Sequence, residues 1–141
     1  MLTYTRRVSA DAVETLLTLA AAHARAVRLL EVHGLSFSEI RLLVPLLGTE
    51  QGRRPTELAH ELHLTASGVT RALLPLERRH IVERLRDPAD ARASLARLTP
   101  AGRTLLGEAL EQAGERAARL LRRLSVGQAK QLTRLLDEIG R

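Results

Sequence analysis

The feature that most constrains the fold of this chain is the two-residue connection Leu64-Thr65 between two short segments of helical periodicity. Apolar residues recur at helical spacing on both sides of it, namely Leu58, Ala59, Leu62, Val69, Leu73 and Leu76. Thr65 is suited to cap the second helix, because its hydroxyl can accept a hydrogen bond from a free N–H of the first turn. Two helices joined by so short a turn are typical of a helix-turn-helix.

The second of these helices is expected to expose small, hydroxyl and arginine side chains opposite its apolar side. Ala66, Ser67, Thr70, Arg71, Leu74 and Arg78 make up this outward set. Side chains of these types suit contact with base edges and phosphates. Pro75 lacks an N–H, and we expect it to bend or unwind the last turn.

A small hairpin is predicted directly after this helix. Residues 81–86 and 94–99 read as short strands, and Asp87-Pro88-Ala89-Asp90 between them has a typical turn composition. Asp90 and Arg92 belong to its loop, while further arginines, Arg84, Arg86 and Arg97, lie on its flanks. The hairpin is therefore interpreted as the wing of a winged helix-turn-helix.

Long amphipathic stretches flank this central region. Ser36 and Glu39 form a capping box for a helix through Leu47, which Pro45 should kink or shorten. We expect a mainly α fold with a small β-hairpin wing, organised as a single domain over residues 1–141. In it, a winged helix-turn-helix at about 36–99 is flanked by N- and C-terminal dimerisation helices at about 9–33 and 100–141.

Charge is distributed unevenly along the chain. Residues 53–104 hold ten arginines against six acidic residues, whereas residues 1–52 are balanced. Only one of the 22 basic residues is lysine, and arginine is the side chain suited to bidentate contact with phosphate and guanine. An arginine-rich composition alone would not identify a DNA-binding protein, but here the excess coincides with the predicted helix-turn-helix and wing.

Several function classes are disfavoured by what the sequence lacks. It contains no cysteine, which excludes disulfides, thiolate metal sites and thiol-based redox sensing. No apolar run approaches the length of a membrane span, and no signal peptide is evident, so we expect no membrane association and a cytoplasmic location. No glycine-rich phosphate loop, activated nucleophile or paired carboxylate pattern stands out, and we expect no enzymatic activity.

Two motifs carry a resemblance to a known family. Asp90-x-Arg92 lies at the predicted wing tip, and Leu98-Thr99-x-x-Gly102 closes the wing and starts the long helix that follows. With these motifs, the run from Pro55 to Leu106 resembles the helix-turn-helix and wing of the MarR (multiple antibiotic resistance regulator) family. The flanking helices have the right lengths and order, so the likeness extends over nearly all of the chain. His80 stands where glycine usually ends the recognition helix, and Ala91 stands where a second arginine is usual.

The resemblance implies a homodimer that places two winged domains in successive major grooves of an inverted-repeat operator. It implies that Ser67, Thr70 and Arg71 face base edges, that Arg92 reaches into the minor groove, and that Asp90 holds Arg92 in place. The full set of expected DNA-binding residues is Thr65, Ser67, Thr70, Arg71, Arg84, Arg86, Asp90 and Arg92. The family pattern further implies a repressor released by a small anionic or aromatic effector, for which His23, Arg25 and His33 are suggested as binding residues.

The alternative readings come from other function classes. His60 and His63 are three residues apart on one predicted helix, but a zinc site needs three or four converging ligands and no third is evident, so no metal or other cofactor is expected. A winged-helix protein-interaction module without operator binding is the other reading. Such a module would have no reason to concentrate positive charge on the recognition helix and wing. The long apolar stripes of the flanking helices favour a homodimer, because one small domain has little surface to bury them.

Overall fold

The computed structural model describes residues 2–140, with the side chains of residues 10–140. The chain forms two compact units. The winged unit comprises residues 31–112, and the helical unit comprises residues 1–30 together with residues 113–141. One helix, α5 (Pro100–Leu121), contributes to both, because its first half belongs to the winged unit and its second half to the helical unit.

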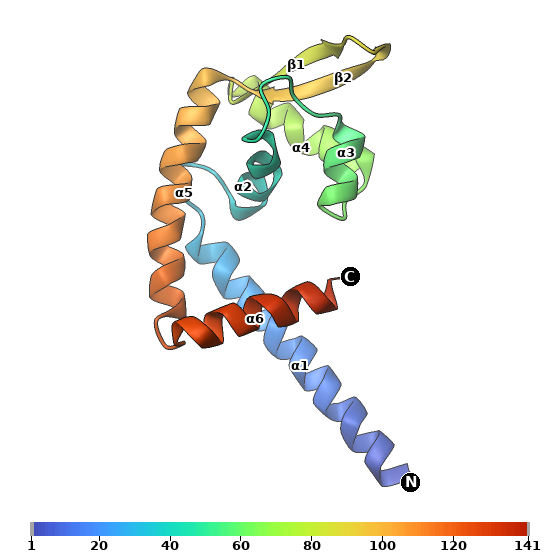
Figure 1. Ribbon diagram of the computed structural model, residues 1–141, viewed down its shortest axis with the longest axis vertical. Helices are drawn as coiled ribbons and strands as arrows, with labels where there is room; N and C mark the ends of the chain where they lie inside the picture. The colour runs from blue at the N-terminus through green and yellow to red at the C-terminus, as the bar shows by residue number, and fades with distance from the viewer. Residues whose placement is uncertain (1, 141) are drawn as a thin grey trace. The chain divides into compact units, whose positions relative to one another are not determined.

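The winged unit is mainly helical and carries one two-stranded antiparallel sheet, which confirms the predicted fold class. Its elements are α2 (Phe37–Leu43), η1 (Val44–Leu46), α3 (Pro55–Glu61), α4 (Ala66–Arg78), β1 (Val82–Asp87), β2 (Asp90–Leu98) and the first half of α5. The hairpin of β1 and β2 projects away from the helices and ends in its turn (Figure 1). The two helices α3 and α4 contact one another, and each also contacts one strand of the hairpin.

Leucines from every helix of the winged unit meet in its core. The largest fully buried side chains are Leu35, Leu43, Leu46, Leu58, Val69, Leu73, Leu76, Val82 and Leu106. They include one side of α4, as the periodicity predicted, and the inward residue of β1. Burial of this aliphatic surface holds α4 and the hairpin on a common base.

Two prolines affect their helices differently. Pro45 ends α2 at Leu43 and starts the single 3-10 turn η1, so the predicted shortening is confirmed. Pro75 is expected to bend or unwind the last turn of α4, and the unwinding is wrong, because α4 continues through Pro75 to Arg78. Proline removes only one hydrogen bond, the one to the carbonyl of Arg71, and the fully buried Leu73 and Leu76 on either side keep the helix packed.

Both helices of the helix-turn-helix end with a histidine in the left-handed conformation. His63 and His80 each have a φ of 54°. After α4, His80 N donates to Glu77 O at 2.9 Å and Ile81 N donates to Leu76 O at 3.0 Å, and the same pair of bonds follows α3. This is the Schellman arrangement, in which glycine is the usual residue. His80 therefore adopts the backbone conformation of the glycine that it replaces in the family pattern.

The helical unit consists of α1 (Leu2–Leu29), the second half of α5, and α6 (Val126–Ile139). The first helix was expected to extend to about residue 33, but it ends at Leu29 because the following residues form a tight turn that pairs Val32 with Leu35. Large apolar side chains of this unit are exposed, namely Val13, Leu16, Leu17, Val126, Leu132, Leu135, Leu136 and Ile139. Within the described residues, no helix is both long and apolar enough to cross a membrane.

Candidate nucleic-acid interface

The N-terminal half of α4 presents a polar surface. Thr65 caps the helix, its hydroxyl accepting a hydrogen bond from the Gly68 N–H at 3.1 Å, as predicted. Ser67 and Arg71 are exposed, and Thr70 is half-buried at the border of this surface. Because the opposite side of α4 is fully buried, this polar surface has a fixed orientation on the winged unit.

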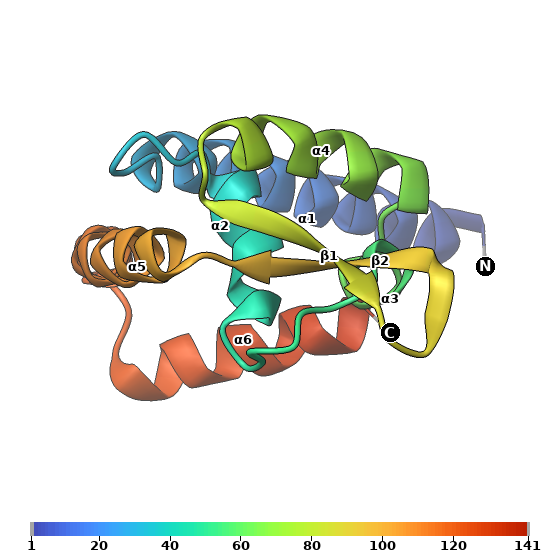
Figure 2. The same cartoon turned by 90° about the horizontal axis from the view of Figure 1, so that it is seen from above.

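The wing is a regular hairpin with a short turn. Residues from Val82 to Arg86 pair with residues from Leu98 to Ser94, and the register then shifts so that Asp87 pairs with Asp90. Pro88 and Ala89 alone connect the two strands, whereas the sequence suggested a four-residue turn from Asp87 to Asp90 (Figure 2). The strands thus run to the tip, and Asp90 and Arg92 lie on β2 rather than in a loop.

Arg86 and Arg92 are exposed cations of the wing. Within the described side chains, neither guanidinium has a hydrogen bond or an ion pair, so both are available to an anionic partner. The Asp90 carboxylate accepts a hydrogen bond from the backbone N–H of Arg92 at 3.0 Å. Asp90 thus fixes the backbone at Arg92, while the Arg92 guanidinium itself stays unpaired.

Arg84 connects the wing to α4. Its guanidinium donates to Glu77 Oε1 on α4 at 2.7 and 3.1 Å, and to Ser94 Oγ on β2 at 3.4 Å. The Arg84 guanidinium is therefore already paired within the winged unit, unlike those of Arg86 and Arg92. On geometry, Arg84 is a positioning residue that fixes the wing against α4.

The end of the wing next to its turn is braced by an ion pair that the sequence did not suggest. Arg54, just before α3, donates through Nε to Asp87 Oδ2 at 2.5 Å, and its Nη2 lies at the same distance. Asp87 is the one buried charged residue among the described side chains, and its Oδ1 also accepts from Ala89 N at 2.8 Å. The hydrogen bonds from Ala89 and from Arg54 lower the pKa of Asp87, and the bond to Asp87 raises the pKa of Arg54.

Of the contacts that Asp87 makes, only the one within the turn could be predicted from the sequence. An aspartate before a proline in a turn commonly accepts a hydrogen bond from the backbone two residues on, as Asp87 does from Ala89. Arg54 lies 33 residues away in sequence, and nothing local connects the two. A second ion pair, Arg97 with Glu83 at 2.8 Å, joins residues directly opposite in the hairpin and follows from its register.

The residues suggested for an effector fall in different units. His23 and Arg25 lie on α1 in the helical unit, and both are exposed. His33 lies in the winged unit, exposed, in the turn before α2 and with a φ of 51°. Arg25 lines a cavity of the helical unit. Neither unit brings all three side chains together.

The histidines considered for metal binding are separated by the end of α3. His60 is on the helix, exposed, and His63 follows it in the left-handed position. Among the described residues, no group of three or more histidine, aspartate or glutamate side chains has an arrangement that could hold a metal ion.

Comparison with known proteins places this geometry in context. Residues 35–94 match the model of the MarR family. A probable transcriptional regulator from Pseudomonas aeruginosa is 29% identical, with a TM-score of 0.79 over 87% of this chain and 94% of the other. The transcriptional repressor CouR, solved bound to a 23-mer DNA duplex, is 27% identical, with a TM-score of 0.80 over 88% and 90%.

A more distant structure has the same fold. A mutant MarR from E. coli complexed with operator DNA is 22% identical, with a TM-score of 0.81 over 92% of this chain and 95% of the other. None of the curated proteins matches the chain in sequence.

Proposed function

Since the chain belongs to the MarR family, we propose that it is a sequence-specific DNA-binding transcriptional regulator whose α4 and wing contact the duplex. In helix-turn-helix proteins the second helix enters the major groove with its N-terminal residues at the base edges. Ser67 and Arg71 have that position on α4, and Thr70 lies at its border. The CouR structure, which holds a DNA duplex, supports the same mode of action.

One observation carries the proposal most directly. Arg71 on α4 and Arg86 and Arg92 on the wing are exposed, and within the described side chains none of the three has an ion pair or hydrogen bond through its guanidinium. Neighbouring arginines such as Arg54 and Arg84, by contrast, are paired with acidic side chains. The winged unit thus uses one set of arginines to hold its shape and leaves the other set for phosphates and bases.

The paired arginines have a function of their own in this proposal. Arg84 joins the wing to α4, and the ion pair of Arg54 with Asp87 joins the wing to the start of α3. These contacts fix the angle between the recognition helix and the wing before DNA binds. A preformed angle reduces the conformational entropy that binding would otherwise cost.

We further propose that the protein acts as a homodimer on an inverted-repeat operator. The exposed apolar side chains of α1 and α6 supply a surface that a second copy would cover, with Leu16, Leu17 and Ile139 each more than half exposed. Repression that is modulated by a small ligand completes the proposal, as the family pattern suggests.

Two substitutions test the contact surface. Against duplexes that the wild type selects from a random pool, Arg71→Ala should lower specific affinity by about 1–3 kcal/mol and blur preference at one position of the half-site. Arg92→Ala should weaken binding to all sequences alike and reduce the slope of log affinity against log salt by about 1. Arg134→Ala, on α6 outside the winged unit, is the matched control. Wild-type affinity in both test variants would refute the assigned surface.

A further inference from the structure

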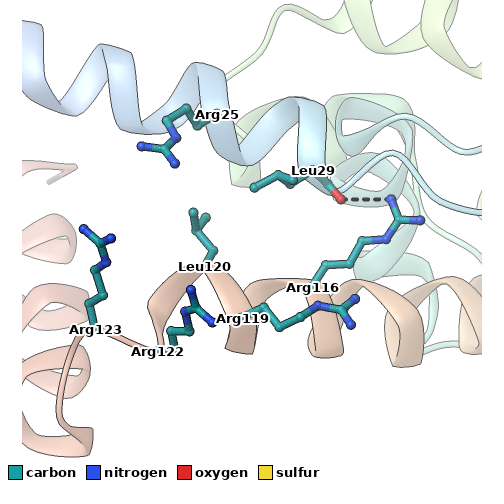
Figure 3. A pocket seen from close by; sticks show the side chains of 7 residues that line it. All are labelled: Arg25, Leu29, Arg116, Arg119, Leu120, Arg122 and Arg123. Atoms are coloured by element: carbon teal, nitrogen blue, oxygen red, sulfur yellow. Dashed lines mark hydrogen bonds between the residues drawn. The ribbon is translucent and has the colours of Figure 1, made fainter.

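The helical unit contains a cavity of about 710 Å³ between the last turns of α1 and the C-terminal end of α5 (Figure 3). Five arginines line it, namely Arg25, Arg116, Arg119, Arg122 and Arg123. Two leucines, Leu29 and Leu120, supply the apolar part of its wall. The volume is within the range of about 300–1,000 Å³ that is usual for small-molecule sites.

Four of the five arginines that line this cavity have no charged partner within the described part of the chain. Arg25, Arg119, Arg122 and Arg123 have no ion pair or hydrogen bond there through their guanidinium groups. Arg116 differs, because its Nη1 donates to the carbonyl oxygen of Leu29 at 3.1 Å (Figure 3). No acidic side chain is among the residues that line the cavity. Gathering several like charges in one concave surface raises the electrostatic potential there and favours the entry of an anion.

We propose that this cavity binds a multiply charged anion with at least two phosphate groups. Guanidinium groups contact phosphate oxygens through paired N–H donors. A phosphate monoester carries a charge of about −1.5 to −2 at pH 7, so two such groups would balance the four unpaired guanidiniums. A single carboxylate would leave three of the four unbalanced. Leu29 and Leu120 provide contact for an apolar portion of the same ligand.

This inference deepens the proposed ligand modulation, and its regulatory meaning rests on that proposed function. It replaces the suggested trio of His23, Arg25 and His33 with a site in which Arg25 acts together with arginines at the end of α5 and directly after it. His33 has no part in it, because it belongs to the winged unit. DNA is also a polyanion, but the proposed DNA contacts are made by the unpaired arginines of α4 and the wing, which belong to the winged unit.

The test uses pyrophosphate as the probe and the full chain without DNA. Calorimetric titration at constant ionic strength should give saturable binding with one pyrophosphate per protomer. The double variant Arg25→Gln/Arg123→Gln should weaken binding at least about tenfold. The control Arg28→Gln/Arg134→Gln removes the same charge from α1 and α6 at positions that do not line the cavity, and it should bind like the wild type.

Three results would overturn the proposal. The first is equal pyrophosphate affinity of the cavity variant and the wild type. The second is an equal loss of pyrophosphate affinity in the cavity variant and the control variant. The third is pyrophosphate binding by the wild type that is no stronger than chloride binding at matched ionic strength. Because Arg25 and Arg123 are exposed, the variant should fold like the wild type, and an unchanged helical circular dichroism spectrum checks this. Because DNA is absent, a failure here leaves the DNA-binding proposal intact, and loss of operator binding leaves this site untouched.

Discussion

Replacing Gly102 with alanine should destabilise the winged unit by forcing the wing base away from α5. A Cβ at residue 102 would lie 2.0 Å from the carbonyl oxygen of Ile81 and 2.8 Å from its carbonyl carbon. That oxygen cannot turn away freely, because it accepts hydrogen bonds from Thr99 N at 3.1 Å and from Thr99 Oγ1 at 3.3 Å. Relief of the clash therefore requires the backbone at Ile81 to move, and this backbone joins the end of α4 to β1.

The size of the effect follows from two opposing contributions. Overpacking against fixed atoms costs about 3 kcal/mol at the upper end of its usual range. Alanine is a better helix former than glycine and returns about 1 kcal/mol. We therefore expect the free energy of unfolding to fall by about 2 kcal/mol, measured by urea denaturation with circular dichroism as the helical signal.

Gly107→Ala in the same helix is the matched control. No heavy atom lies within 4 Å of a Cβ built at Gly107, so only the helix-propensity contribution remains. This variant should gain roughly 0.5–1 kcal/mol, opposite in sign to Gly102→Ala. Equal stability of the Gly102 variant and the wild type would show that this close approach does not hold the wing base against α5.

Three further outcomes are expected. Because the pKa of Asp87 is lowered in the folded state, the ionised carboxylate stabilises the fold above its unfolded pKa of about 3.9, and this stability is lost as pH falls through the folded pKa. In Asp87→Asn the free energy of unfolding should therefore fall less steeply as the pH is lowered in this range. The same pH dependence in the variant and the wild type would contradict the ion pair with Arg54. His80→Gly should raise the free energy of unfolding by about 1 kcal/mol in urea denaturation, because an L-residue in the left-handed region costs roughly that much; a loss would show that the His80 side chain stabilises the turn. Leu73→Ala should cost about 2–5 kcal/mol in the same assay, and a cost under 1 kcal/mol would mean that the core beneath α4 is not packed as described.

The order and type of the elements could be predicted because local signals agreed with the packing. The capping box of Ser36 and Glu39, the Thr65 cap and the apolar side of α4 all appear where spacing placed them. Pro75 shows the limit of such signals. Its local cost was correctly identified, but the burial of Leu73 and Leu76 outweighs it, and burial depends on the whole unit.

The candidate site was only partly readable for the same reason. The exposure of Ser67 and Arg71 follows from helical geometry, so it could be predicted. Whether an arginine is free or paired depends on residues far away in sequence, as with Arg54 and Asp87, or on an adjacent element, as with Arg84 and Glu77. The composition shows an excess of arginine, but it does not show which arginines are paired within the protein and which are unpaired.

Selection of DNA from a random pool by the purified protein tests sequence-specific operator binding most directly. We expect enrichment of an inverted repeat whose half-sites lie about 10 base pairs apart, centre to centre, as two α4 helices on one face of the duplex require. Insertion of about five base pairs between the half-sites should reduce binding towards the non-specific level. No enriched sequence would contradict sequence-specific binding, and an asymmetric single half-site that is bound with undiminished affinity would contradict recognition by a symmetric dimer.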